Sequence, residues 1–167
     1  MLAQIVVMCH LALQPSTAPS SYAGEESRAI KSLSADQIDG YLNARGMGLA
    51  KAAELNNYPG PMHVLELKDQ LGLSAGQVGR TQAAFDEMKR RATELGRAIV
   101  ERERELDQAF AMQTIDERSL DEEAMEIGRL QAELRAAHLR AHVRMREVLT
   151  REQIERYGQL RGYRDRK

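Results

Sequence analysis

The sequence of 167 residues has no tryptophan, two phenylalanines and a single cysteine. Aromatic residues make up only 4% of the chain, so its core must be aliphatic and thin. The one cysteine, Cys9, lies in the first apolar stretch, which excludes a disulfide framework and a CxxC metal site. Ala, Leu, Glu, Arg and Gln dominate from residue 75 onward, a composition typical of long helices, and we therefore expect an all-α protein.

Motifs of the common enzyme classes are also missing. The chain has no GxSxG, no P-loop and no GxGxxG. His138 and His142 have the i, i+4 spacing of a helical zinc site, but Leu139 stands where a metalloprotease carries its general-base Glu. We therefore expect a protein that is not an enzyme, and a metalloenzyme of unrecognised type is the third alternative.

No apolar run is long enough to cross a bilayer, which takes about 20 residues. Residues 2–13 read LAQIVVMCHLAL, which is typical of the apolar part of a secretory signal, and Ser21-Tyr22-Ala23 offers a cleavage site before Gly24. No Lys or Arg precedes Arg28, although a signal normally starts with positive charge. Two interpretations stay open: an exported protein with a misassigned start codon, or a disordered cytosolic tail.

One phrase occurs three times and indicates three helix starts. In each copy a Ser or Thr can act as the N-cap, and a Gln three residues later can bond back to the N-cap backbone, which forms a capping box. The copies are Leu33-Ser34-Ala35-Asp36-Gln37, Leu73-Ser74-Ala75-Gly76-Gln77 and Leu149-Thr150-Arg151-Glu152-Gln153. The motif residues of the last two copies are Leu73, Ser74, Gln77, Leu149, Thr150 and Gln153.

A heptad pattern follows the second phrase. Apolar residues recur seven apart, and a second row falls between them with one charged interruption at Arg102. Such a seam needs a partner helix, and a stripe from Leu120 to Val148 supplies one, after a turn over residues 113–119 capped by Ser119. The pattern predicts an antiparallel helical hairpin. Its apolar surface is predicted to bind a client protein or a second copy through Val78, Phe85, Met88, Leu95, Ile99 and Leu106.

Shorter helices are expected before the hairpin, from Ser34 to about Arg45, over residues 49–56, and from Met62 to about Leu71. The prolines and glycine of residues 57–61 separate the last two. A final helix is expected from Arg151 to about Leu160.

The net charge of −1 hides two segments of opposite sign. Residues 101–128 carry three basic and ten acidic side chains, whereas residues 129–167 carry eleven basic and five acidic ones. These segments are two solvated helix faces, or they meet each other within the hairpin or across a dimer. No aromatic interleaving accompanies the basic segment, so we do not expect nucleic-acid binding.

Histidines one helical turn apart are the strongest candidates for chemistry. His138 and His142 project from one face, with Met145 close behind, and His63 and Glu66 form a second group at i, i+3. Imidazole and thioether donors suit copper, nickel, cobalt or zinc rather than magnesium or calcium. The alternative is structural: His138 and Met145 can be core residues, and His63 and His142 can be surface residues.

The paired phrases around a heptad hairpin resemble the LTxxQ motif of the Spy/CpxP family. The block from Tyr58 to Leu67 and the pair His138-x3-His142 are similar to the heavy-metal sensing and resistance branch of that family. The resemblance covers about residues 45–163, and it departs from the family at Gly76, where an acidic residue is common.

The resemblance implies a periplasmic stress-response protein that forms a cradle-like or intertwined homodimer. It implies binding of unfolded or envelope proteins without ATP, sensing of a transition metal, or both, with a membrane-bound signalling partner in the sensors. It implies His63, Glu66, His138, His142 and Met145 as metal ligands, for Zn, Ni, Co or Cu. The runner-up interpretation is a coiled-coil adaptor dimer without ligand.

We divide the chain into four parts. Residues 1–23 are predicted to be a signal peptide or disordered tail, 24–33 a linker, 34–163 a single all-α domain, and 164–167 a polar tail.

Overall fold

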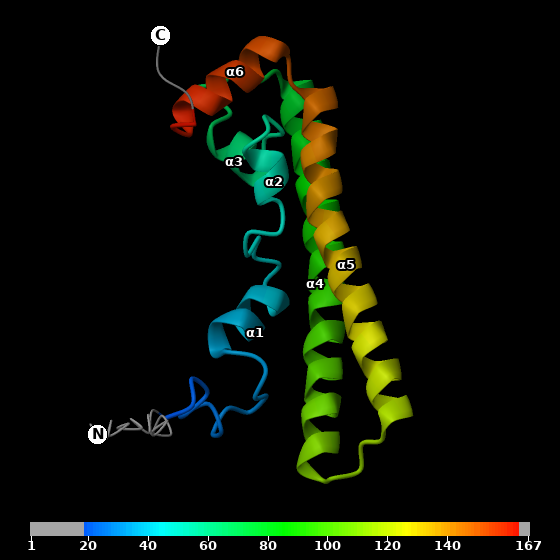
Figure 1. Ribbon diagram of the computed structural model, residues 1–167. Helices are drawn as coiled ribbons and strands as arrows, with labels where there is room; N and C mark the ends of the chain where they lie inside the picture. The colour runs from blue at the N-terminus through cyan, green and yellow to red at the C-terminus, as the bar shows by residue number, and fades with distance from the viewer. Residues whose placement is uncertain (1–18, 164–167) are drawn as a thin grey trace, which may run out of the picture.

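The computed structural model describes residues 19–163, which form helices and no strand (Figure 1). The helices are α1 (Ala35–Leu42), α2 (Lys51–Glu54), α3 (Pro61–Glu66), α4 (Ala75–Ala111), α5 (Glu117–Val148) and α6 (Arg151–Leu160). This confirms the all-α fold. The predicted tail at residues 164–167 and residues 1–18 of the predicted signal lie outside the described residues. Within 19–163 no helix is long and apolar enough to cross a membrane.

The three predicted capping boxes are all present. In each, the backbone N–H of the glutamine donates to the hydroxyl of the N-cap, and the glutamine side chain accepts from the N-cap N–H. The N-cap and glutamine pairs are Ser34 with Gln37 at 3.2 Å, Ser74 with Gln77 at 3.3 Å and Thr150 with Gln153 at 3.2 Å. They satisfy helix N–H groups that have no partner inside the helix, which fixes where α1, α4 and α6 begin.

The glutamines of the second and third phrases also bond to each other. Gln77 Nε2 donates to Gln153 Oε1 at 2.7 Å and to the carbonyl of Val148 at 3.0 Å. Gln153 Nε2 lies 3.3 Å from the carbonyl of Leu71. The repeated phrase therefore starts two helices and ties their starts together.

This bridge gives a measurable coupling. Gln77→Ala and Gln153→Ala are each expected to lower the free energy of unfolding by about 1 kcal/mol, because each removes hydrogen bonds that are partly buried. The double variant is expected to lose at least about 0.5 kcal/mol less than the sum, as measured by urea denaturation. Gln37 has only its local capping bonds, so Gln37→Ala with Gln77→Ala should be additive. Additivity for Gln77 with Gln153 would contradict the bridge.

Helices α4 and α5 pack side by side as an antiparallel hairpin, which confirms the central architectural prediction (Figure 1). Apolar side chains close the seam: Ala92, Leu95, Ile99, Leu130 and Leu134. The charged interruption at Arg102 is accommodated because its guanidinium lies 3.3 Å from Glu123 of α5 and 2.9 Å from Glu105. Ala124, one turn after Leu120 in the stripe predicted from Leu120 to Val148, is exposed.

The start of α5 differs from the prediction. Ser119 is not the N-cap; Asp116 is, and Ser119 occupies the third helical position of its capping box. Both Asp116-x-x-Ser119 and Ser119-x-x-Glu122 fit the capping-box motif. The turn between α4 and α5 is shorter than predicted, so the box that starts at Asp116 forms.

The short helices also end earlier than predicted. Helix α1 ends at Leu42 and α2 at Glu54 because Ala44 and Asn57, just beyond, have φ of 53° and 66°, which a right-handed helix does not allow. Helix α3 ends at Glu66, and residues 67–72 continue as turns.

Residues 24–33 are not a free linker. Ile30 and Leu33 are buried against Val100 of α4, and the hydroxyl of Ser32 donates to Glu103 at 2.6 Å. This segment therefore belongs to the packed domain.

A second core cluster lies at the other end of the hairpin and joins α3, α4, α5 and α6. Its buried members are Val64, Leu71, Ala84, Met145, Leu149, Ile154 and Tyr157. This cluster holds α3 and α6 against the hairpin. The cavity described below lies between it and the cluster of the hairpin seam.

Within the described residues of the protomer, the acidic and basic segments form ion pairs with each other only where they join in the sequence. Among the described residues, Arg129 is the only cation of the basic segment that pairs with an acid of residues 101–128, namely Glu126. The acidic segment forms the closed end of the hairpin, and residues 140–163 lie at the other end (Figure 1). Contact between the acidic and basic segments across a dimer stays a prediction.

Candidate functional site

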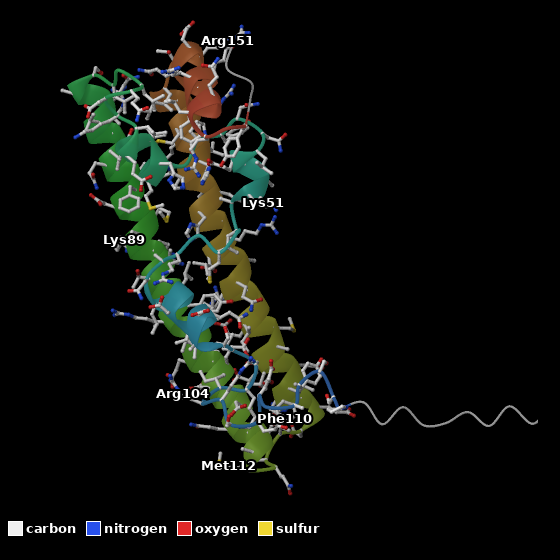
Figure 2. The ribbon with its side chains drawn as sticks, turned by 90° about the vertical axis from the view of Figure 1, so that its left-hand side faces the viewer. Lys51, Lys89, Arg104, Phe110, Met112 and Arg151 are labelled. Atoms are coloured by element: carbon white, nitrogen blue, oxygen red, sulfur yellow. The ribbon has the colours of Figure 1, made fainter. Side chains whose placement is uncertain are left out.

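A cavity of about 640 Å³ lies on the face of the hairpin that α1, α2 and α3 cover. Its walls come from α4, α5, residues 43–63 and the residues just after α6. Lys51 and Lys89, labelled in Figure 2, both belong to this lining. His63, His138 and His142 all line it, although His63 is 75 positions before His138 in the chain. Of the five predicted ligands, the structure brings these three to one cavity and places Glu66 and Met145 outside its lining.

His142 is held in one orientation. Its Nδ1 lies 2.7 Å from the carbonyl oxygen of Tyr58, and because a carbonyl only accepts, Nδ1 must carry the proton. The neutral ring therefore has its lone pair on Nε2. The ring packs on Gly60, where an added Cβ would lie 3.1 Å from Cε1 and 3.3 Å from Nε2, so glycine lets the imidazole approach the start of α3.

His138 is the buried member of the pair. Its side chain lines the cavity, the residue is only 5% exposed, and Nε2 is buried without a hydrogen-bond partner in the described protein. Burial, and then the neighbouring His142, hold the pKa of His138 below its usual value. The imidazole therefore stays neutral near pH 7, the form that a metal ion requires.

His63 has a carboxylate partner. Its Nδ1 donates to Glu66 Oε2 at 2.8 Å, which leaves Nε2 as the free nitrogen. Glu66 thus orients His63, as outer partners of metal-binding histidines do.

Met145 is fully buried in the cluster that joins α3, α4, α5 and α6. Met145 is therefore a core residue, as the structural alternative predicted, and its sulfur packs against apolar side chains. Within residues 19–163, no three His, Cys, Asp or Glu side chains are already gathered closely enough to hold a metal ion. Binding therefore needs side-chain rotation within the cavity.

Glu54 is a site residue that sequence reasoning missed. Its Oε1 accepts from the hydroxyls of Tyr157 at 2.5 Å and Tyr163 at 3.1 Å, and Arg161 Nε lies 3.7 Å away. Its Oε2 lies 3.6 Å from His142 Nδ1. Burial, and then the Glu54 carboxylate, raise the pKa of Tyr157, so its phenol stays protonated and donates.

Unsatisfied buried polar atoms concentrate here. In the described part of the chain, four buried side-chain atoms lack a hydrogen-bond partner: Glu54 Oε2, Glu123 Oε2, His138 Nε2 and Arg161 Nε. Three of the four belong to residues that line this cavity. Because native proteins leave few such atoms, their concentration marks this cavity as a place where ordered water, an ion or a ligand would supply the missing interactions.

The predicted client or dimer surface is split by the fold. Leu95 and Ile99 are buried in the protomer's own seam, so the prediction was wrong for these two residues. The other four, Val78, Phe85, Met88 and Leu106, are half-buried, and Phe85 and Met88 line the cavity.

Comparison with known proteins gives one match. A family model described as heavy-metal resistance matches residues 45–156, which is more than half of the chain and includes the three histidines and Glu54. Searches of curated proteins and of solved structures returned no match.

Proposed function

This chain belongs to the heavy-metal resistance family, the Spy/CpxP-like family that its paired phrases resemble, and we propose that it binds a transition-metal ion in the cavity. In this proposal His138 and His142 are the principal ligands and His63 is a third. The protein acts as a sensor or binding protein in metal resistance and carries out no catalysis.

The observation that carries the proposal is the pair of nitrogens on α5. His138 Nε2 is buried and unpartnered, and His142 presents Nε2 because Tyr58 holds the proton on Nδ1. Donation of the other ring N–H to a carbonyl or carboxylate is typical of metal-binding histidines. Imidazole ligands suit zinc, copper, nickel and cobalt.

Glu54 connects this site to α6. One carboxylate oxygen faces His142, and the other accepts from Tyr157 of α6 and from Tyr163 just beyond it. A metal ion held at His142 would lie beside this carboxylate. The arrangement supports a sensing role, because ion binding and the packing of α6 depend on the same residue.

Client binding is the second candidate function. Exposed apolar side chains at the cavity support it: Met47, Leu55 and Met62 are 42%, 55% and 46% exposed. A periplasmic location, a homodimer and a signalling partner stay predictions that rest on the family and on the amino-terminal sequence.

Native mass spectrometry tests the proposal on the full chain, stripped of metal and then given Zn(II), Ni(II), Co(II) or copper. We expect one ion per chain at the histidine site for at least one of these metals. Adducts no more abundant than on an unrelated protein of similar charge would refute the proposal.

A further inference from the structure

We infer that the cavity binds a soft monovalent ion, Cu(I) or Ag(I), more tightly than a divalent ion, and that the thioethers of Met47, Met62 and Met88 complete its ligand set. This inference rests on the proposed function, since it takes the α5 histidines as ligands. Three of the six methionines in the described chain line this one cavity.

The three methionines come from three different elements. Met47 lies in the segment between α1 and α2, Met62 in α3, and Met88 in α4, while the histidine pair comes from α5. The three therefore line one cavity from different sides, although Met88 also packs against the core cluster of the hairpin seam. Met47 and Met62 are 42% and 46% exposed, so neither side chain is enclosed in a core. Methionine side chains are flexible enough to move toward an ion.

The backbone at Met47 favours this interpretation. Met47 has φ of 42°, in the left-handed region that glycine adopts most readily, and Gly48 follows with φ of 77°. A long side chain at such a position costs about 1 kcal/mol or more. Its sulfur packs on Gly40 of α1, where an added Cβ would come within 2.3 Å of Sδ, so this thioether must rotate away from α1 to reach an ion in the cavity.

The remaining walls favour a soft, singly charged ion over a hard or doubly charged one. Glu54 is the only carboxylate residue in the cavity lining within the described chain, and Oε1 already accepts two hydrogen bonds. Lys51, Lys89 and Arg161 line the same cavity, so the surrounding charge is positive and penalises a doubly charged ion more than a singly charged one. Thioether donors select Cu(I), whereas carboxylate and carbonyl oxygens suit Mg, Ca and Mn.

The test compares the full chain with a triple variant, Met47→Leu with Met62→Leu and Met88→Leu. Leucine keeps the volume and apolar character and removes the sulfur. The matched control is the double variant Met112→Leu with Met125→Leu. Met112 and Met125 are 66% and 76% exposed and do not line the cavity. Figure 2 shows Met112 at the closed end of the hairpin, far from Lys51 and Lys89. Affinities for Cu(I), Ag(I) and Zn(II) are measured anaerobically by competition with a chromogenic chelator.

In the triple variant we expect the Cu(I) and Ag(I) affinities to fall by at least about tenfold and the Zn(II) affinity to stay within about twofold. The control should match the wild type. Ag(I) added to protein with ¹³C-labelled methionine methyl groups should shift the signals of Met47, Met62 and Met88 but not those of Met112 and Met125.

Unchanged Cu(I) and Ag(I) affinities in the triple variant, or Ag(I) binding without those methyl shifts, would overturn the inference and leave histidine binding of Zn(II) standing. Failure of the wild type to bind any of the three ions would overturn both the inference and the proposed function.

Discussion

His142→Ala is expected to lower the affinity for transition-metal ions by at least about a hundredfold, and His138→Ala with His142→Ala to abolish binding. Loss of an outer partner alone typically costs 10–100-fold in metal affinity, and His142 is proposed to be a ligand itself. The His142 ring is already placed by its bond to Tyr58 and by its contact with Gly60, so the rotation that binding requires falls on the other ligands. Isothermal titration of the metal-free protein measures the change.

Two further variants separate ligand loss from structural damage. His142→Gln keeps an N–H donor for the Tyr58 carbonyl and removes the imidazole, so it should lose affinity and keep the melting temperature. Val143→Ala, at a half-exposed position next along α5 and outside this cavity, should bind as the wild type does. A folded His142→Ala variant with wild-type affinity would remove His142 from the site.

Gly96→Ala is expected to lower the free energy of unfolding by about 2–3 kcal/mol, near the upper end for an overpacked core position. A Cβ on Gly96 would lie 2.1 Å from the carbonyl oxygen of Tyr41 and 2.7 Å from its carbonyl carbon. These are backbone atoms at the end of α1, and no side-chain rotation relieves the clash. Helix α1 must move away from α4, which also uncovers the side of Tyr41 that packs on the hairpin seam.

Gly128→Ala is the matched control. Gly128 lies inside α5 with nothing within 4 Å of an added Cβ, so alanine there should stabilise the protein by about 0.5–1 kcal/mol. Urea denaturation gives both energies, and hydrogen exchange should show faster exchange in residues 35–42 for Gly96→Ala alone. Equal effects of the two substitutions would show that α1 does not pack as described.

Local patterns predicted the helices well where the chain carries its own start signal. Ser34, Ser74 and Thr150 cap the helices predicted for them because a capping box involves only residues three apart. The same motif failed at Ser119 because two overlapping boxes fit the sequence, and the geometry of the turn decides between them. The end of α1 was missed because left-handed Ala44 carries no local signal. Asn57 does favour a helix end, and α2 stops three residues before it.

The site was predictable only in part. The spacing of His138 and His142 indicates one helix face, but their meeting with His63 depends on how α3 packs against the hairpin. Glu54 lies in a four-residue helix without a motif, and its partners Tyr157 and Tyr163 are more than 100 positions away. Met145 follows the rule that a methionine on an apolar stripe is usually core.

The central claim is that the α5 histidines bind a metal ion in the cavity, and a crystal structure of the Zn(II)-loaded protein with data at the zinc edge tests it most directly. We expect one strong anomalous peak per chain, about 2.0–2.1 Å from Nε2 of both His138 and His142. A peak at the surface alone, between His63 and Glu66 for example, or no peak in crystals grown with excess zinc, would contradict the claim and favour a coiled-coil adaptor without ligand.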